Sequence, residues 1–286
     1  MYSSIILNMY QLTSAKRVQV VKCLVEGNSL RATARMTGVA RNTVSSLLVD
    51  LAKACWDYQN DALRGLTCRR VEADEIWAFC YAKEANVPTE HKGEFGYGDI
   101  WTWVAMDADT KLIVSWLVGE RDTPTAIDFM TDVRERIANR TQLTTDGLVC
   151  YLTAVEEACG ADVDYGQLVK VYGHNPDSER RYSPARFIVA EKREVSGSPD
   201  AALVSPSHIE RQNLTMRMGM QRFTRLTNGF SKKAANLEAA VALHYQFYNF
   251  ARPHKSLANP YPRTPAMAAG VADHVWSVEE IVGLIS

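Results

Sequence analysis

The feature that most constrains this chain is a pair of neighbouring carboxylates inside a segment with strand character. Apolar and aromatic residues of the segment 71–79 surround Asp74 and Glu75. Branched and aromatic side chains favour a sheet, and a charged side chain is costly to bury there without a partner. A divalent metal is one such partner, because hard cations take oxygen ligands. The segment therefore predicts a strand that carries metal-ligating carboxylates.

Two later acidic residues are candidates to complete a metal site with Asp74. Asp146 stands in a Thr-Thr-Asp-Gly segment, and Glu210 stands in Ser-His-Ile-Glu-Arg-Gln-Asn. We expect Asp74, Asp146 and Glu210 to converge on a metal pair, as both catalytic residues and metal ligands. Mg²⁺ fits such a site because it is hard and oxygen-loving, and Mn²⁺ is the alternative ion.

Other acids compete for the same role, and Glu210 has a structural alternative. Glu75 is the main rival of Asp74, but it is expected to point to the opposite face of the strand, so that only one of the pair should matter. Asp107 and Asp109 lie in a predicted turn, where Asp is favoured for backbone reasons alone. Glu210 follows Ser207 by three residues, which also matches a helix capping box.

The formal net charge of −1 hides three blocks of charge. Residues 1–70 hold 10 Lys and Arg against 4 Asp and Glu, residues 71–165 hold 7 against 19, and residues 166–265 hold 15 against 7. Two basic blocks that flank an acidic centre suit phosphate binding and metal capture, although charge blocks are also found on merely solvated faces.

The composition also limits the compartment. A membrane span needs a long, nearly uninterrupted apolar run, and the chain has none, nor does its N-terminus show the pattern of a signal peptide. The six cysteines are scattered without a Cys-x-x-Cys pair, which indicates reduced thiols rather than a zinc ribbon. We therefore expect a cytoplasmic protein with no membrane partner.

The first part of the chain predicts a helix-turn-helix. Helices are predicted over 14–26, 30–37 and 41–54, with a tight turn at Gly38-Val39 between the last two. In that motif the second of two short helices enters the major groove of double-stranded DNA. The alternative is an ordinary three-helix bundle without a DNA role. The polar faces of these helices and of a basic helix that begins at Ser207 supply the candidate DNA-binding residues Arg31, Arg35, Arg41, Asn42, Thr43, Ser45, Arg211 and Arg217.

The central part of the chain predicts a mixed sheet. A strand at Asp74 is followed by a hairpin over 100–118, a helix that Thr123 caps, and a strand that ends at Asp146. This order places the ends of the first and last strands near each other, and it is the core of the ribonuclease H-like fold. We thus expect an α+β or α/β chain. Its predicted parts are a helix-turn-helix domain over 1–66, a ribonuclease H-like catalytic domain over 67–265 with an insertion at about 150–205, and a helical tail over 266–286.

Several motifs in this order resemble bacterial insertion-sequence transposases of the DDE type, most closely the IS-one family. They are Asp-Glu-Ile-Trp at 74–77, Thr-Asp-Gly at 145–147, Ile-Glu-Arg-Gln-Asn at 209–213, the helix-turn-helix segment 31–39, and Tyr-Asn to Arg-Pro-His at 248–254. The resemblance covers roughly residues 15–265. The chain departs from the family in lacking an N-terminal zinc ribbon, and in the long stretch of sequence that separates Asp146 from Glu210.

The resemblance implies a DNA transposase that uses magnesium, acts on the terminal repeats of its element and on target DNA, and works as a homo-oligomer. It assigns the acidic triad to Asp74, Asp146 and Glu210. The alternatives are a helix-turn-helix regulator that tolerates loss of the acids, a catalytically dead transposase remnant, and a ribonuclease H-like nuclease that cuts without joining.

Overall fold

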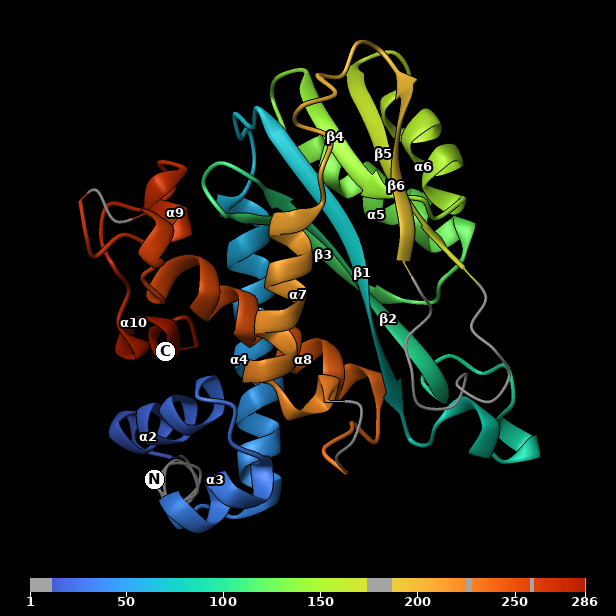
Figure 1. The fold of residues 1–286 in the computed structure, drawn as a ribbon. Coiled ribbons are helices and arrows are strands. Elements are labelled where there is room, and N and C mark those ends of the chain that lie inside the picture. Colours follow the sequence, from blue (N-terminus) through green and yellow to red (C-terminus); the bar gives the residue numbers. More distant parts are fainter. Residues whose placement is uncertain (1–11, 174–186, 225–227, 258–259, 286) are drawn as a thin grey trace. The chain divides into compact units, whose positions relative to one another are not determined.

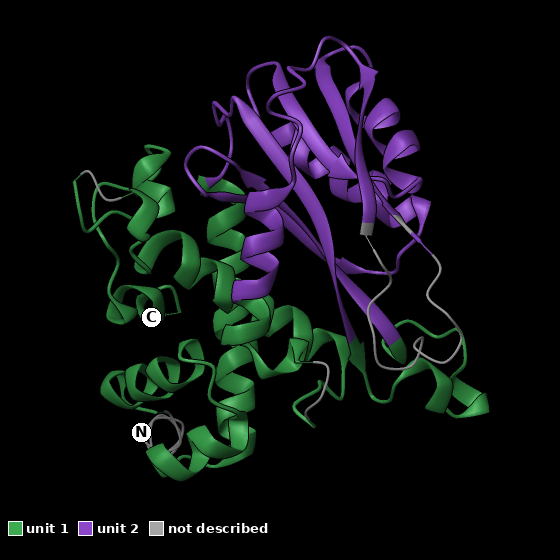
Figure 2. Ribbon diagram, viewed as in Figure 1, with its two compact units in different colours: residues 1–62, 79–98, 216–286 green, residues 63–78, 99–215 purple. Residues whose placement is uncertain are grey.

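The contacts of the chain divide it into two compact units. The computed structural model describes residues 12–173, 187–224, 228–257 and 260–285. Unit 1 comprises residues 1–62, 79–98 and 216–286, and unit 2 comprises residues 63–78 and 99–215 (Figure 2). The contacts thus group the N-terminal helices with the C-terminal part of the chain, and the domain boundaries at residues 66 and 265 stay predictions.

Unit 1 begins with three helices, α2 (Ser14–Val25), α3 (Leu30–Thr37) and α4 (Arg41–Ala62). The hydroxyl of Ser29 caps α3 by accepting from the backbone N–H of Ala32 at 3.1 Å, as serine commonly does at a helix start. Gly38 ends α3 in the left-handed conformation, which glycine adopts without a steric cost. All three helices begin where the pattern predicted them, and α4 extends beyond its predicted end. The assignment of a DNA-binding helix-turn-helix domain to them stays a prediction.

The C-terminal helices of unit 1 pack against α4. Along α4 the buried side chains include Val44, Leu47, Leu48 and Leu51. The ring of Tyr58 on α4 lies 4.8 Å from that of Trp276 between centroids. The segment 79–98 of unit 1 contains η1 (Glu84–Asn86) and η2 (Thr89–His91). The C-terminal elements are η3 (Gln221–Phe223), α8 (Ala234–Gln246), the π-turn η4 (Phe247–Ala251), η5 (Lys255–Leu257), α9 (Pro265–Ala268) and α10 (Val278–Gly283). Because α4 and α8 bury apolar faces together, the two ends of the chain share one core.

Unit 2 is built on a six-stranded mixed sheet with the order β3-β2-β1-β4-β5-β6 (Figure 1). The strands β1 and β4 are parallel, as are β4 and β5, whereas β2 with β3 and β5 with β6 are antiparallel. The strands are β1 (Arg70–Cys80), β2 (Gly98–Asp107), β3 (Ile113–Gly119), β4 (Thr141–Asp146), β5 (Val163–Tyr172) and β6 (Phe187–Ser196). The predicted hairpin and the predicted neighbourhood of the first and fourth strands are therefore present.

Helices cover both faces of this sheet. Figure 1 shows α5 (Thr123–Arg136) and α6 (Cys150–Cys159) on one face and α7 (Ser207–Gly219) on the other. The cap of α5 is one residue earlier than predicted, because the carboxylate of Asp122 accepts from the backbone N–H of Thr125 at 3.0 Å. Aspartate is among the favoured residues at that position. Large buried side chains such as Trp103, Phe129 and Tyr151 fill the layer between the sheet and the helices α5 and α6.

The stretch from residue 150 to residue 205 does not stand apart from the sheet. Its helix α6 packs on α5, and its strand β5 lies parallel to β4 with Asp146 opposite Leu168. The predicted insertion thus contains core elements of unit 2, and β6 adds one further strand at the edge. Local sequence patterns cannot tell a core strand from an inserted one, because sheet pairing is non-local.

Candidate metal centre

Strand β1 carries three carboxylates with different surroundings. Side chains alternate along a strand, so Glu72 and Asp74 share one face and Glu75 belongs to the other. The face of Glu72 and Asp74 is the one against which α7 packs. Glu72 is buried, and one of its oxygens accepts from the backbone N–H groups of His208 at 2.8 Å and of Ile209 at 3.0 Å. Nδ1 of His208 lies 2.6 Å from its other oxygen.

Glu72 therefore caps α7. The first N–H groups of a helix have no partner within the helix, and a carboxylate placed there satisfies them and favours the positive end of the helix dipole. The carboxylate of Glu210 is not committed to the capping box that its spacing with Ser207 allowed, because it forms an ion pair with Lys170 of β5. Sequence analysis missed this role of Glu72, which depends on the pairing of β1 with a helix far away in the chain.

Asp74 and Asp146 meet as the sequence predicted. Asp146 ends β4, the parallel neighbour of β1, and its Oδ1 accepts from the backbone N–H of Leu148 at 2.9 Å. Asp74 accepts from Nδ2 of Asn213 on α7 at 2.8 Å. One oxygen from each of Asp74, Glu75 and Asp146 lies within 4.8 Å of the other two. Three carboxylates from two adjacent strands thus face one small volume.

Glu75 belongs to this group in spite of its position on the other face of the strand. Its Oε1 accepts from Nε and Nη2 of Arg121 at 2.9 and 2.5 Å, and its Oε2 lies 3.4 Å from the hydroxyl of Tyr151. The guanidinium of Arg121 also lies over the ring of Trp101, 4.6 Å from its centroid. Alternation predicted opposite faces for Asp74 and Glu75, so that only one of the pair should matter, but it did not predict that their carboxylates would still approach each other.

The acidic group is short of positive charge. Burial and then the charge of Asp146 raise the pKa of Asp74 to about 6, with a smaller contribution from Glu210. Burial and the charges of Asp146 and Asp74 raise the pKa of Glu75 to about 7, although Arg121 acts against this shift. Like charges and low solvation both disfavour ionised carboxylates. A divalent cation would relieve both effects, so the residues present fit a hard metal ion with oxygen ligands.

Glu210 lies on α7 outside this group of three. Its side chain is 41% exposed and paired with Lys170, while its charge still acts on Asp74. An exposed ion pair of this kind is weak, so Glu210 can exchange Lys170 for another cation. The structure therefore brings together Asp74 and Asp146 and leaves Glu210 near them, and the assignment of all three as catalytic metal ligands stays a prediction.

The rival ligands Asp107 and Asp109 serve the turn in which they lie. Asp107 accepts from the backbone N–H groups of Asp109 at 3.2 Å and of Thr110 at 3.3 Å. Asp109 pairs with Arg69 and Arg70. The bonds of Asp107 to nearby backbone N–H groups are the kind of contact that makes Asp common in turns.

The predicted DNA-binding residues lie mostly at the surface of their helices. On α3 and at the start of α4 the side chains of Arg31, Arg35, Arg41, Asn42 and Thr43 are exposed, and Ser45 is half-buried. On α7 Arg211 is exposed and Arg217 is half-buried. Exposure leaves these groups available to a phosphate backbone, and their role stays a prediction.

Comparisons with known proteins are distant. No protein-family model matches the chain, and no curated protein matches its sequence. The fold is similar to the piggyBac transposase synaptic complex with hairpin DNA, with a TM-score of 0.40 and 11% identity over 95% of this chain and 69% of that one. It is also similar to the Mos1 strand transfer complex, with a TM-score of 0.25 and 11% identity over 81% of this chain and 76% of that one. Because both TM-scores lie below 0.5, we base the functional conclusion on the site residues. Among the described helices, none combines the length and the hydropathy that a membrane crossing needs.

Proposed function

We propose that the protein is a DNA transposase that cleaves and joins the ends of its insertion element by metal-dependent phosphoryl transfer. The observation that carries the proposal is the meeting of Asp74 and Asp146 on adjacent parallel strands, beside the helix that bears Glu210. The order of these motifs also resembles the DDE pattern of bacterial insertion-sequence transposases, most closely the IS-one family. This assignment makes unit 2 a ribonuclease H-like catalytic unit.

We assign the third metal ligand to Glu210 rather than to Glu75. Glu75 is buried and held by Arg121 and Tyr151, so its carboxylate already has partners that neutralise and orient it. Glu210 has an exposed ion pair, and such a pair costs little to break. The helix α7 is held to β1 at two places, by Glu72 and by Asp74 through Asn213, so Glu210 has a fixed position relative to the two aspartates.

The reaction that we propose exchanges one phosphodiester bond for another. Water attacks a phosphorus at the end of the element, the P–O bond to the 3′ oxygen breaks, and a 3′-hydroxyl leaves. That hydroxyl then attacks a phosphorus of the target strand, so that one P–O bond forms and one breaks. Mg²⁺ or Mn²⁺ held by the carboxylates would supply activation of the attacking oxygen and charge stabilisation at the leaving oxygen.

The protein groups act by orientation. The N–H of Leu148 fixes the carboxylate of Asp146, and the amide of Asn213 fixes that of Asp74. Double-stranded DNA would be bound by the basic surface of α3 and α4 and by Arg211 and Arg217 of α7, because arginine binds phosphate groups through paired N–H donors. Pairing of two element ends requires a homo-oligomer.

The test uses the full chain and the DNA that flanks its own gene, with Mg²⁺ or Mn²⁺. Wild-type protein is compared with Asp146→Asn and with Asp128→Asn, an exposed position on α5 that serves as a matched control. We expect metal-dependent nicking at the repeat ends by wild type and by the control variant. The Asp146→Asn variant should bind the same DNA and leave it uncut.

Each result decides between named functions. Nicking followed by strand joining supports the transposase, and cutting without joining supports a ribonuclease H-like nuclease. Binding without cutting by all three proteins would reject the catalytic proposal in favour of a helix-turn-helix regulator or a dead remnant. Retained cleavage in Asp146→Asn would remove this residue from the site.

A further inference from the structure

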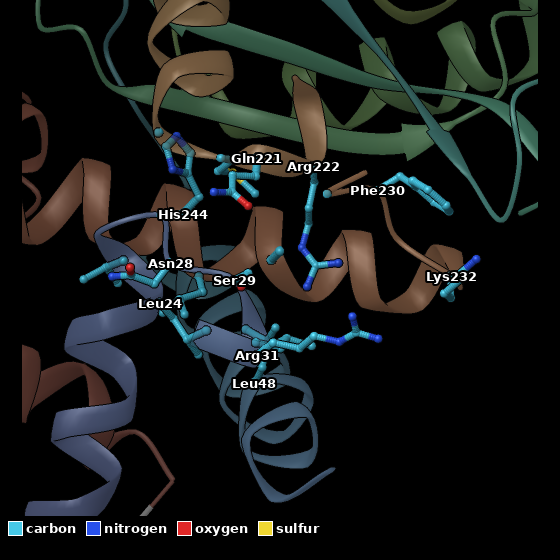
Figure 3. Close-up of a pocket in the computed structure, with 18 of the residues that line it drawn as sticks. Leu24, Asn28, Ser29, Arg31, Leu48, Gln221, Arg222, Phe230, Lys232 and His244 are labelled. Atoms are coloured by element: carbon cyan, nitrogen blue, oxygen red, sulfur yellow. The ribbon is translucent and has the colours of Figure 1, made fainter. Parts of the chain in front are cut away.

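Unit 1 contains a cavity of about 610 Å³ on the side of the N-terminal helices (Figure 3). Part of its wall is the turn between α2 and α3 with the start of α3, and α4 contributes Arg41 and Leu48. The opposite wall comes from residues 219–222, 228–230 and 232 and from α8. The two walls are in close contact at Gly27, where an added Cβ would lie 2.4 Å from the carbonyl oxygen of Gly219. The cavity is therefore built from residues that lie far apart in the chain.

The charges on the cavity wall are all positive. The lining includes Arg31, Arg41, Arg222 and Lys232, and no Asp or Glu is among the described residues that line it. Within the described part of the chain, none of these four cations forms an ion pair with a carboxylate. Lys232 lies over the ring of Phe230, 4.5 Å from its centroid. A positively charged wall of this kind attracts an anionic ligand and repels a cationic one.

Arg222 is the residue that most clearly lacks a counter-ion. Its guanidinium donates to the hydroxyl of Ser231, which carries no charge, and burial lowers the pKa of Arg222. A charged group taken out of water is costly unless an opposite charge accompanies it. Figure 3 shows Arg222 and Arg31 extending into the same space from opposite walls. Two guanidinium groups arranged in this way match the oxygens of a phosphate group.

Apolar side chains line another part of the cavity wall, beside the uncharged polar residues Asn28, Ser29, Gln221 and Asn228. Leu24, Leu48, Leu243 and Phe230 present apolar side chains, and Nε2 of His244 is buried without a hydrogen-bond partner in the described part of the chain. Burial, with a smaller contribution from Arg252, lowers the pKa of His244 to about 4, so the imidazole is neutral near pH 7. A neutral imidazole nitrogen beside apolar side chains suits the edge and the faces of a nucleobase.

We propose that this cavity binds a nucleotide, with its phosphate between Arg31 and Arg222 and its base against the apolar wall near His244. The nucleotide is either free or part of a DNA strand, since both present the same chemistry. The inference goes beyond the proposed function, because it needs neither the carboxylates of unit 2 nor a metal ion. It also gives Arg31 and Arg41, which were predicted to contact DNA, two partners from the other end of the chain.

The test measures binding to the full chain in EDTA, so that cleavage in unit 2 plays no part. The probes are adenosine 5′-monophosphate, a short single-stranded DNA, and adenosine as the probe without phosphate. Titration calorimetry or fluorescence anisotropy compares wild type with Arg31→Gln, Arg222→Met and Lys53→Gln. Lys53 is an exposed residue of α4 outside the cavity lining, so its variant removes one positive charge from the same unit without touching the site.

We expect wild type and Lys53→Gln to bind a phosphate-bearing probe with equal affinity and to bind adenosine far more weakly. A hydrogen bond to a charged group contributes about 1.5–3 kcal/mol, so Arg31→Gln and Arg222→Met should each raise the Kd about tenfold or more. Binding of the free nucleotide identifies a nucleotide site, and binding of the DNA strand alone identifies a strand site. Both outcomes support the proposal.

Two results would overturn it. One is the absence of binding of either phosphate-bearing probe, and the other is equal affinity in wild type, Arg31→Gln and Arg222→Met. Thermal unfolding without probe controls for folding. Because Arg222→Met removes a buried charge that lacks a counter-ion, its Tm should equal or exceed that of wild type. If that variant fails to fold, Arg31→Gln still decides the question with adenosine 5′-monophosphate as the probe, because contacts of Arg31 with a DNA backbone play no part in binding the free nucleotide. Cleavage by unit 2 does not enter any of these readouts, so this inference and the proposed function fail separately.

Discussion

The two units differ in the sign of the charge that each gathers in one place, negative in unit 2 and positive in unit 1. In unit 2 three carboxylates meet with Arg121 as the cation that contacts one of them. In unit 1 four cations line a cavity without a carboxylate among the described lining residues. Each arrangement is costly in the free protein, because like charges repel and low solvation leaves them unscreened. The comparison leads to the two ligands that we propose, a metal ion for unit 2 and a phosphate for unit 1, because each would bring the opposite charge.

The two sites differ in how the chain builds them. The carboxylates of unit 2 come from two adjacent parallel strands, and each could be selected as a candidate from the sequence of its own segment. The cavity of unit 1 joins the turn after α2 to the segment after α7, so its cations share no local pattern. A cluster of carboxylates on two central strands can thus be predicted from sequence, whereas a cluster of cations between distant helices is seen only in the folded unit.

The largest expected effect concerns the third carboxylate of unit 2. We expect Glu210→Gln to lower the rate of metal-dependent cleavage about 10³-fold, because loss of a metal ligand removes several kcal/mol of charge stabilisation. Glu75→Gln should lower the rate by about tenfold or less, since Glu75 is held by Arg121. Single-turnover cleavage of end DNA measures both rates. The reverse order would make Glu75 the third ligand and would leave Glu210 as a partner of Lys170.

The next effect concerns the attachment of α7 to the sheet. We expect Glu72→Ala to lower the free energy of unfolding by about 3 kcal/mol, because it leaves the buried N–H groups of His208 and Ile209 without an acceptor. Urea denaturation measures the change. The control is Glu157→Ala on the exposed face of α6, which should leave stability nearly unchanged because surface substitutions away from such contacts have small effects. Equal stability of Glu72→Ala and wild type would show that this cap does not hold α7 in place.

Metal binding should stabilise unit 2 in a way that depends on Asp146. At a Mn²⁺ concentration 100 times its Kd, we expect wild type to gain about 2.7 kcal/mol, seen as a rise in Tm. Asp146→Asn should lose this gain. In EDTA the same variant should unfold at a higher Tm than wild type, because it removes the charge that crowds Asp74 and Glu75. A Mn²⁺ effect of equal size in both proteins would locate the metal elsewhere.

The smallest effect concerns His244 in unit 1. Its pKa is lowered in the folded state from the ordinary value of 6.5 to about 4. The unfolded chain therefore binds more protons below that ordinary value, and stability falls as the pH falls. We expect wild type to lose about 2 kcal/mol more than His244→Gln between about pH 6.5 and about pH 4.5. Denaturant unfolding at several pH values measures this difference. Parallel pH profiles would mean that His244 stays solvated in unit 1.

Sequence reasoning predicted much of the fold and the central pair of the site. The starts of α2, α3 and α4, the β2–β3 hairpin and the pairing of β1 with β4 follow from local patterns and strand order. Asp74 was identified because a carboxylate inside an apolar strand is unusual enough to be informative. Asp146 was identified from the predicted order of the strands and from the Thr-Asp-Gly motif of the resemblance. The assignment of catalytic roles, the helix-turn-helix function and the domain boundaries remain predictions.

What the sequence determined by itself is therefore local: which segments form helices and strands, and which strands carry acids that need a cation. Only the tertiary structure decided which partners those acids have. Glu72 caps α7, Arg121 and Tyr151 hold Glu75, and β5 joins the central sheet because of contacts between residues far apart in the chain. The basic cavity of unit 1 has the same origin, since the packing of α4 on α8 joins the two ends of the chain. Local propensity does not predict which elements pair, because pairing depends on the burial of whole apolar faces rather than on neighbouring residues.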